Sequence, residues 1–221
     1  MKLLSLDSET TGVDTKLDVP VEVAWVEIDE DFNVLSEFES LVNPHRSIPL
    51  EASEVNGIYD HHLEGAPELH DLPWPDEDVV LIGHNIMFDW YMIGQNQNVN
   101  VVEQFCTMRM ARRLWPTSTP NHKLQTLVEI FDLPVRGRAH TSLADVYSVI
   151  ELVKYMSRWT GKSLNQMREE LEVPHIFSLC PIGKFKGREF KDIPKAYLDW
   201  ILSADFDPDI RASALRALGR K

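Results

Sequence analysis

The sequence contains few cysteines, no long apolar runs and little positive charge. Each of these features excludes a class of protein. Its two cysteines, Cys106 and Cys180, lie far apart and form no CxxC pair, which fits a reducing compartment better than a disulfide framework. No stretch approaches the roughly 18 consecutive apolar residues that cross a bilayer. Asp7 interrupts the first apolar run, so we predict no signal peptide. From the two separate cysteines and the lack of a long apolar stretch we predict a cytoplasmic location and no membrane association.

Positive charge is scarce, since 22 Lys and Arg stand against 35 Asp and Glu, for a net charge of −13. This balance argues against a protein that holds nucleic acid by a broad basic surface. It still admits an enzyme that meets nucleic acid at one small site, where metal ions neutralise the acids. The charge is also uneven, because residues 175–221 carry a net +3 and residues 1–174 a net −16. A solvated basic tail explains that difference equally well.

The pattern of apolar residues predicts an α/β domain. Strands are predicted at 3–7, 21–28, 34–42 and 79–82, and helices from Ile86 onward and at 108–114, 124–131 and 142–156. Strands first, then strands mixed with helices, indicate a mixed sheet. A capping box at 163–166 begins a helix that Pro174 would end, so we predict one domain over 1–174 and a small domain over 175–221. The small domain contains helical patterns at 197–204 and 210–218.

Four carboxylates occupy positions where the patterns call for apolar residues. Asp7 and Glu9 share one side of the first strand with Leu3 and Ser5, because side chains alternate along a strand. A strand end that runs into solvent would explain this pair on its own.

Asp89 falls in the apolar stripe of the helix that begins at Ile86, and Asp145 in that of the helix over 142–156. Each of these two could singly be a helix-end cap. Together with Asp7 and Glu9 they would repel one another, and Mg²⁺ or Mn²⁺, which prefer oxygen ligands, would relieve the repulsion.

His140 lies five residues before Asp145, in the loop that contains Arg136 and Arg138. A loop histidine is usually a solvated surface residue. Close to two cations, however, the ring would be held neutral and could accept a proton from water.

Three motifs together resemble the DEDDh class of DnaQ-like 3′→5′ exonucleases. They are Asp7-Ser8-Glu9-Thr10-Thr11-Gly12, His84-Asn85-Ile86-Met87-Phe88-Asp89, and the H-x₄-D spacing of His140 and Asp145. Each motif alone is weak, but all three occur in the family's order over about residues 1–157. Two positions depart from the family pattern: Asn56 stands where His is frequent and Ser142 where Ala is frequent. Neither position belongs to the four carboxylates and the histidine of the three motifs.

The resemblance implies a ribonuclease-H-like fold, with a five-stranded mixed sheet flanked by helices. It implies that Asp7, Glu9 and Asp145 bind the metal ion that carries the attacking water, and that Asp7 bridges to a second ion supported by Asp89. His140 would deprotonate the water. Two divalent cations, Mg²⁺ or Mn²⁺, would stabilise the attacking and leaving oxygens of an in-line displacement that releases nucleoside 5′-monophosphates from the 3′ end.

The same resemblance implies the substrate contacts. Main-chain groups of Thr10, Thr11 and Gly12 lie where the family holds the terminal nucleotide, and Val13 and Phe88 would pack against its base. Core packing explains Phe88 equally well. Arg138, beside His140, would meet the phosphates. The predicted substrate-binding residues are therefore Thr10, Thr11, Gly12, Val13, His84, Asn85, Phe88 and Arg138.

A second match lies in the C-terminal segment, where residues 181–187, 193–194 and 197–200 resemble the small domain of exodeoxyribonuclease X-like proteins. That match favours single-stranded DNA or DNA 3′ ends as the substrate. The alternatives left open are an RNA-trimming enzyme of the ribonuclease T or oligoribonuclease type, a polymerase proofreading subunit, and a non-catalytic nucleic-acid-binding subunit. The sequence shows neither a polymerase partner nor a homodimer.

Overall fold

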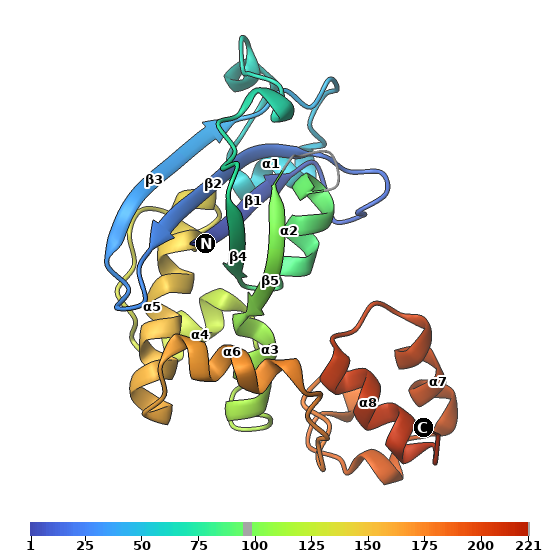
Figure 1. Cartoon of the computed structure of the whole chain (residues 1–221). Helices are drawn as coiled ribbons and strands as arrows, with labels where there is room; N and C mark the ends of the chain where they lie inside the picture. Colours follow the sequence, from blue (N-terminus) through green and yellow to red (C-terminus); the bar gives the residue numbers. More distant parts are fainter. Residues whose placement is uncertain (95–98, 221) are drawn as a thin grey trace.

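A computed structural model describes residues 1–94 and 99–220 (Figure 1). Its strands form a five-stranded sheet in the order β3-β2-β1-β4-β5. The central pair β1–β2 and the pair β2–β3 are antiparallel, whereas β1–β4 and β4–β5 are parallel. The sheet is therefore mixed, as predicted, and the strands are β1 (Lys2–Thr10), β2 (Pro20–Ile28), β3 (Val34–Leu41), β4 (Asp78–Gly83) and β5 (Asn100–Cys106).

The predicted helices are present, with small changes at their ends. Ser163 begins α6 through the predicted capping box, since its hydroxyl accepts from the Gln166 N–H and the Gln166 side chain accepts from the Ser163 N–H. The helices are α1 (Leu50–Asn56), α2 (Ile86–Ile93), α3 (Thr107–Leu114), α4 (Leu124–Ile130), α5 (Ser142–Thr160), α6 (Leu164–Glu172), α7 (Lys195–Ser203) and α8 (Pro208–Ala217).

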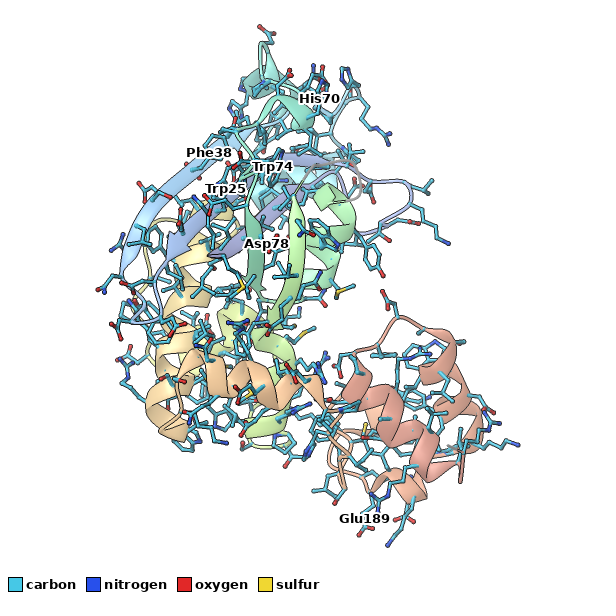
Figure 2. The ribbon with its side chains drawn as sticks, in the orientation of Figure 1. Trp25, Phe38, His70, Trp74, Asp78 and Glu189 are labelled. Carbon is cyan, nitrogen blue, oxygen red and sulfur yellow. The ribbon has the colours of Figure 1, made fainter. Side chains whose placement is uncertain are left out.

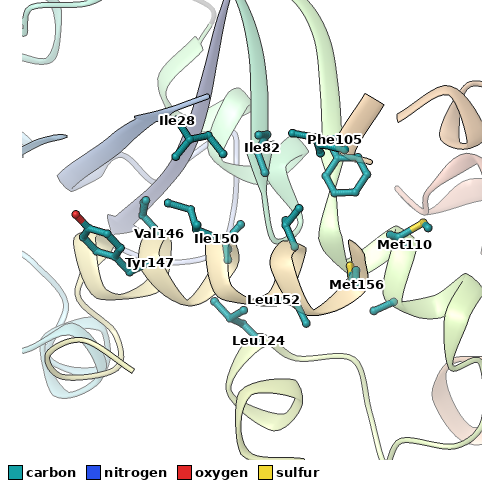
Figure 3. Packing of buried hydrophobic residues seen from close by; sticks show 14 of the residues in the cluster. Ile28, Ile82, Phe105, Met110, Leu124, Val146, Tyr147, Ile150, Leu152 and Met156 are labelled. Atoms are coloured by element: carbon teal, nitrogen blue, oxygen red, sulfur yellow. The ribbon is translucent and has the colours of Figure 1, made fainter. Parts of the chain in front are cut away.

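Helix α5 covers one face of the sheet and forms the larger part of the core. Its 19 residues place an apolar stripe against every second side chain of the strands. Figure 3 shows Ile28, Ile82 and Phe105 of the sheet above Val146, Ile150 and Met156 of the helix. The N-terminal end of α5 thereby lies against β1 and β2, the two strands that pair at Asp7 and Glu9.

The other face of the sheet packs against α2 and carries aromatic side chains of its own strands. Trp25 of β2 stacks on Phe38 of β3 at 4.1 Å and on Trp74 at 4.7 Å between ring centroids (Figure 2). Leu4 and Leu6 of β1 point to this face, whereas Leu3 points toward α5. The alternation predicted for β1 is therefore confirmed.

Residues 175–220, the C-terminal module, have a separate hydrophobic cluster built around Phe190, Leu198, Ile201 and Ile210. The module lies beside α3 (Figure 1), and buried ion pairs connect the two. Among the described helices, none is long and apolar enough to cross a membrane.

The arginines of α3 face the C-terminal module. Asp209, which is fully buried, accepts from Arg109 at 2.7 Å and from the Nε of Arg113 at 2.6 Å, while Arg112 pairs with Asp207. These three arginines therefore have carboxylate partners within the chain.

Candidate active site

Asp7 and Glu9 lie inside β1, which continues to Thr10 and is longer than predicted. Ser5, on the same side of the strand, donates a 3.4 Å hydrogen bond to the Val146 carbonyl of α5. This contact orients the Asp7 and Glu9 side of the strand toward the helix that contains Asp145.

Asp89 reaches the site from α2, on the first turn of the helix. It is 4% exposed, and its Oδ1 accepts from the Ser8 main-chain N–H at 3.0 Å and from the Ser8 hydroxyl at 2.8 Å. Because Ser8 stands between Asp7 and Glu9, these two bonds attach Asp89 directly to the strand that contains Asp7 and Glu9. The predicted placement of Asp89 on a buried helix face is confirmed.

Asp145 and His140 reach the site from α5 and the loop before it. Asp145 is buried, and the side-chain amide of Gln125 lies 3.3 Å from both of its oxygens. His140 is exposed and adopts a left-handed backbone conformation with φ of 63°. One ligand atom from each of Glu9, His140 and Asp145 lies within 4.8 Å of the others. The chain thus brings His140 together with two of the acids that the sequence indicated.

The acids of the site shift one another's proton affinity. Burial, followed by the charges of Asp89 and Asp145, raises the pKa of Asp7 well above its ordinary value. Burial and then Asp145 raise the pKa of Glu9 to about 8, and burial raises the pKa of Asp89 to about 7. The pKa of Asp145 is also raised by burial, although His140 and Gln125 oppose the shift. A carboxylate cluster whose charged forms are disfavoured to this extent is suited to divalent cations.

Glu22 is a fifth carboxylate that the sequence reading missed. It lies opposite Glu9 in the β1–β2 pair, is 9% exposed, and accepts a 2.7 Å hydrogen bond from the Ser142 main-chain N–H. The signal was present in the sequence, because Glu22 shares the apolar side of β2 with Ala24 and Val26. Its carboxylate satisfies an N–H group at the start of α5 that has no partner inside the helix.

The two departures from the family pattern take part in hydrogen bonds around the site. The Ser142 hydroxyl accepts from the Glu9 main-chain N–H at 3.1 Å. Asn56, buried at the end of α1, donates to the Thr10 carbonyl at 3.5 Å and accepts from the Ile58 N–H at 2.9 Å. Both residues connect neighbouring elements to β1.

The predicted nucleotide contacts at the end of β1 and in the loop after it are partly occupied within the chain. The Thr10 hydroxyl donates to the Gly12 carbonyl at 2.6 Å, the Thr11 hydroxyl to Asp18 at 2.8 Å, and the Thr11 N–H to the Val19 carbonyl at 2.9 Å. A Cβ at Gly12 would come within 2.5 Å of the Asp18 carboxylate, which explains glycine there.

Val13 is 88% exposed, so it is accessible to a base. Asn85 is exposed and Phe88 half-buried against the α2 core. Arg138 lies near Glu9, whose raised pKa it lowers in part, and donates to the Val55 carbonyl at 3.4 Å. A Cβ at Gly57 would meet the Arg138 guanidinium at 2.5 Å, and Gly57 also has φ of 79°.

His84, another predicted substrate contact, has partners for both of its ring nitrogens within the chain. Its Nε2 donates to the His122 carbonyl at 2.7 Å, and its Nδ1 lies 2.9 Å from the Thr107 hydroxyl. Burial lowers the pKa of the ring to about 4, so the ring is neutral. With both ring nitrogens occupied, the His84 side chain ties the start of α2 to α3, and a substrate contact of His84 stays a prediction. The sequence motif could not show this, because Thr107 and His122 are distant in the chain.

Comparisons with known proteins identify the family and the fold of the chain. The exonuclease family model named for RNase T matches residues 4–153. Exodeoxyribonuclease 10 of Escherichia coli (strain K12) is 25% identical over 216 residues, covering 93% of this chain and 94% of that protein. DNA polymerase III PolC-type of Bacillus subtilis (strain 168) is 28% identical over 176 residues. The match to the polymerase covers 75% of this chain and only 12% of the polymerase.

Solved structures show the same fold. Exonuclease X in complex with 5′ overhanging duplex DNA has a TM-score of 0.63 and 26% identity, covering 76% of this chain and 98% of that one. A zinc-bound complex of E. coli exonuclease I with single-stranded DNA has a TM-score of 0.62 over 77% of this chain and 42% of that one. Its identity is 17%, so it supports the fold alone. The chain belongs to the RNase T exonuclease family, among the DnaQ-like DEDDh 3′→5′ exonucleases.

Proposed function

We propose that this chain is a metal-dependent 3′→5′ exonuclease that hydrolyses single-stranded DNA or frayed DNA 3′ ends to nucleoside 5′-monophosphates. The observation that carries the proposal is the convergence of acids from β1, α2 and α5 with His140 beside them. Such crowding disfavours the ionised carboxylates of the folded protein, and fold stability alone does not require it. A hydrolase site that binds divalent cations explains why these carboxylates lie so close together.

The donor set fits two hard divalent cations such as Mg²⁺ or Mn²⁺, since it consists mainly of carboxylate oxygens. We assign Asp7, Glu9 and Asp145 to one cation, and Asp7 together with Asp89 to the other. When bound, the two cations supply charge stabilisation to the attacking and leaving oxygens of a displacement at phosphorus.

We assign His140 as the general base that takes the proton from the attacking water. The side chain is exposed and lies beside Glu9 and Asp145, so it can reach a water at the site and return the proton to solvent. A positioned base of this kind typically contributes about 10²–10⁴-fold to the rate. Arg138, next to Glu9, is our candidate for a phosphate contact.

DNA is the favoured substrate because the chain is similar to an exodeoxyribonuclease in sequence and to a solved exonuclease bound to overhanging duplex DNA in structure. RNA trimming remains the alternative, since the two chemistries share the same acids and base. The presence of all four acids and the histidine argues against a non-catalytic binding subunit. A proofreading role and a cytoplasmic location stay predictions.

The test uses single-stranded DNA and RNA of one sequence, each labelled at the 5′ end, with Mg²⁺ or Mn²⁺. We expect labelled products that shorten one nucleotide at a time, faster from DNA than from RNA, and none with a chelator. Faster shortening of RNA would favour the RNA-trimming alternative. Loss of the label as a mononucleotide, or no hydrolysis of either substrate, would contradict the proposal.

A further inference from the structure

A row of aromatic rings runs along the C-terminal module, from the short 3₁₀ turn at Gly183–Phe185 across α7 to Phe206, just after that helix. Phe185 meets Tyr197 edge-on with 4.7 Å between ring centroids, and Tyr197 meets Trp200 at 4.9 Å. Trp200 then contacts Phe206 edge-on at 5.3 Å. Phe185, Tyr197 and Phe206 pack in part on the module's hydrophobic cluster, whereas the Trp200 side chain is outside that cluster and 48% exposed.

Two positively charged side chains, Lys184 and Arg188, lie over these aromatic rings. The Lys184 ammonium lies 5.2 Å from the Phe185 ring centroid and 5.3 Å from that of Tyr197. The Arg188 guanidinium lies 5.4 Å from the Phe185 ring on the same turn. Both side chains are exposed, and within residues 1–94 and 99–220 neither is in a salt bridge.

Two neighbouring basic residues, Lys186 and Lys191, have partners. Lys191 pairs with Glu189 at 2.6 Å, and the Lys186 ammonium donates to the Thr119 carbonyl of the nuclease part. The sequence alone could not separate Lys184 and Arg188 from these two.

We propose that the basic aromatic face, formed by Lys184, Phe185, Arg188, Tyr197 and Trp200, binds single-stranded DNA upstream of the 3′ end held at the active site. This inference rests on the proposed function and adds a second contact to it. Exposed rings offer stacking surfaces to bases of any sequence, and cations beside them meet the phosphates. The face also lies in the part of the chain with a net +3, whereas residues 1–174 carry a net −16 and would repel the phosphates.

The face is held in a fixed position relative to the nuclease part. Lys186 connects the turn to Thr119, and the pairs of Asp207 and Asp209 with the α3 arginines hold α8. A second contact at a fixed position raises the affinity for a strand long enough to reach both sites, and leaves shorter strands unaffected.

The experiment uses the full chain with Trp200→Ala, Trp200→Phe and Lys184→Gln, and Lys191→Gln as the matched control. Binding is measured across a salt series with Ca²⁺ in place of Mg²⁺, using thymidine oligonucleotides of about 20 and about 4 residues, a range that brackets single-strand site sizes. For the longer strand, Trp200→Ala should weaken binding roughly 5- to 100-fold, as loss of one base stack does, and Trp200→Phe should restore most of it. Lys184→Gln should make the slope of log affinity against log salt shallower by about 0.7, and Lys191→Gln should not.

Hydrolysis of the shorter strand with Mg²⁺ separates this inference from the proposed function. Every variant should degrade it at the wild-type rate, because the face is outside the active site. Wild-type affinity and slope for the longer strand in Trp200→Ala and Lys184→Gln would overturn the inference while the nuclease assignment stands. Failure of the wild-type chain to degrade either strand would instead contradict the proposed function.

Discussion

Glu22 and Ser142 are joined by a 2.7 Å hydrogen bond from the main-chain N–H of the first residue of α5 to a buried carboxylate of β2. Ser142 in turn accepts from the Glu9 main-chain N–H. This pair fixes the start of the helix that contains Asp145 against the strand that contains Asp7 and Glu9. Glu22 therefore positions the start of α5 by accepting this hydrogen bond.

Glu22→Ala should lower both activity and stability. Removal of the acceptor leaves a buried N–H unsatisfied, which costs about 1–3 kcal/mol in the free energy of unfolding, and frees α5 to shift Asp145. Glu22→Gln keeps a carbonyl acceptor and removes a charge that raises the pKa of Asp7 and Glu9, so it should retain most of the kcat. Glu27→Gln on the same strand is the control. Equal loss of kcat in Glu22→Gln and Glu22→Ala would show that the charge, and not the hydrogen bond, matters.

The metal-free protein should become less stable as the pH rises. Glu9 and Asp89 have folded pKa values of about 8 and about 7, whereas unfolded carboxyls titrate near about 4. Between these values the folded state holds more protons than the unfolded state, so the free energy of unfolding decreases with pH. Urea unfolding in chelator at about pH 5 and about pH 8 measures this decrease, which Glu9→Gln should reduce. Stability that rises over this interval, or an equal slope in Glu9→Gln, would contradict the account.

Asp209→Ala should destabilise the chain by about 3–5 kcal/mol, because it leaves the largely buried charges of Arg109 and Arg113 without their shared partner. Burial would raise the pKa of Asp209, but hydrogen bonds from Arg113 and Arg109 hold it below its ordinary value. Asp199→Ala, which removes an exposed pair with Arg220, should cost no more than about 1 kcal/mol. The free energy of unfolding in urea checks both, and equal losses would argue against a buried ion-pair connection between α3 and α8.

His140→Ala should lower kcat by about 10²–10⁴-fold, and higher pH should restore part of the loss, because hydroxide then replaces the base. The exposed His70 is the control, since His70→Ala should leave kcat unchanged. Initial rates from about pH 5.5 to about pH 8.5 test this expectation. A fall of less than about tenfold, with a profile parallel to wild type, would remove His140 from the role of base.

Much of the fold could be predicted because its long elements have clear periodicity. Helix α5 and strands β1 and β2 follow from the spacing of their apolar residues, and Asp89 and Asp145 were detectable as exceptions within that spacing. Strand β5 was missed, since as a partly exposed edge strand it mixes Asn100, Glu103 and Gln104 with apolar residues. Helix α1 has only seven residues, too few for a helical period to stand out.

The parts of the site that could not be predicted depend on contacts between distant residues. Both ring nitrogens of His84 are satisfied by Thr107 and His122, and the α3 arginines meet Asp207 and Asp209 about a hundred residues later. Local patterns do not contain such pairings. They reveal that a polar group is buried, but its partner becomes known only when the fold is known.

Asp7 tests the central claim most directly, because it is the acid assigned to both cations. Asp7→Asn and the control Asp78→Asn, which changes an exposed residue at the start of β4, are compared in hydrolysis of 5′-labelled single-stranded DNA with Mg²⁺ or Mn²⁺. Asp7→Asn should lower kcat by at least about 10³-fold, since a ligand shared by two cations supplies several kcal/mol of transition-state stabilisation, while the metal-free protein stays folded. Asp78→Asn should match wild type. Activity of folded Asp7→Asn within about tenfold of wild type would contradict the two-cation account.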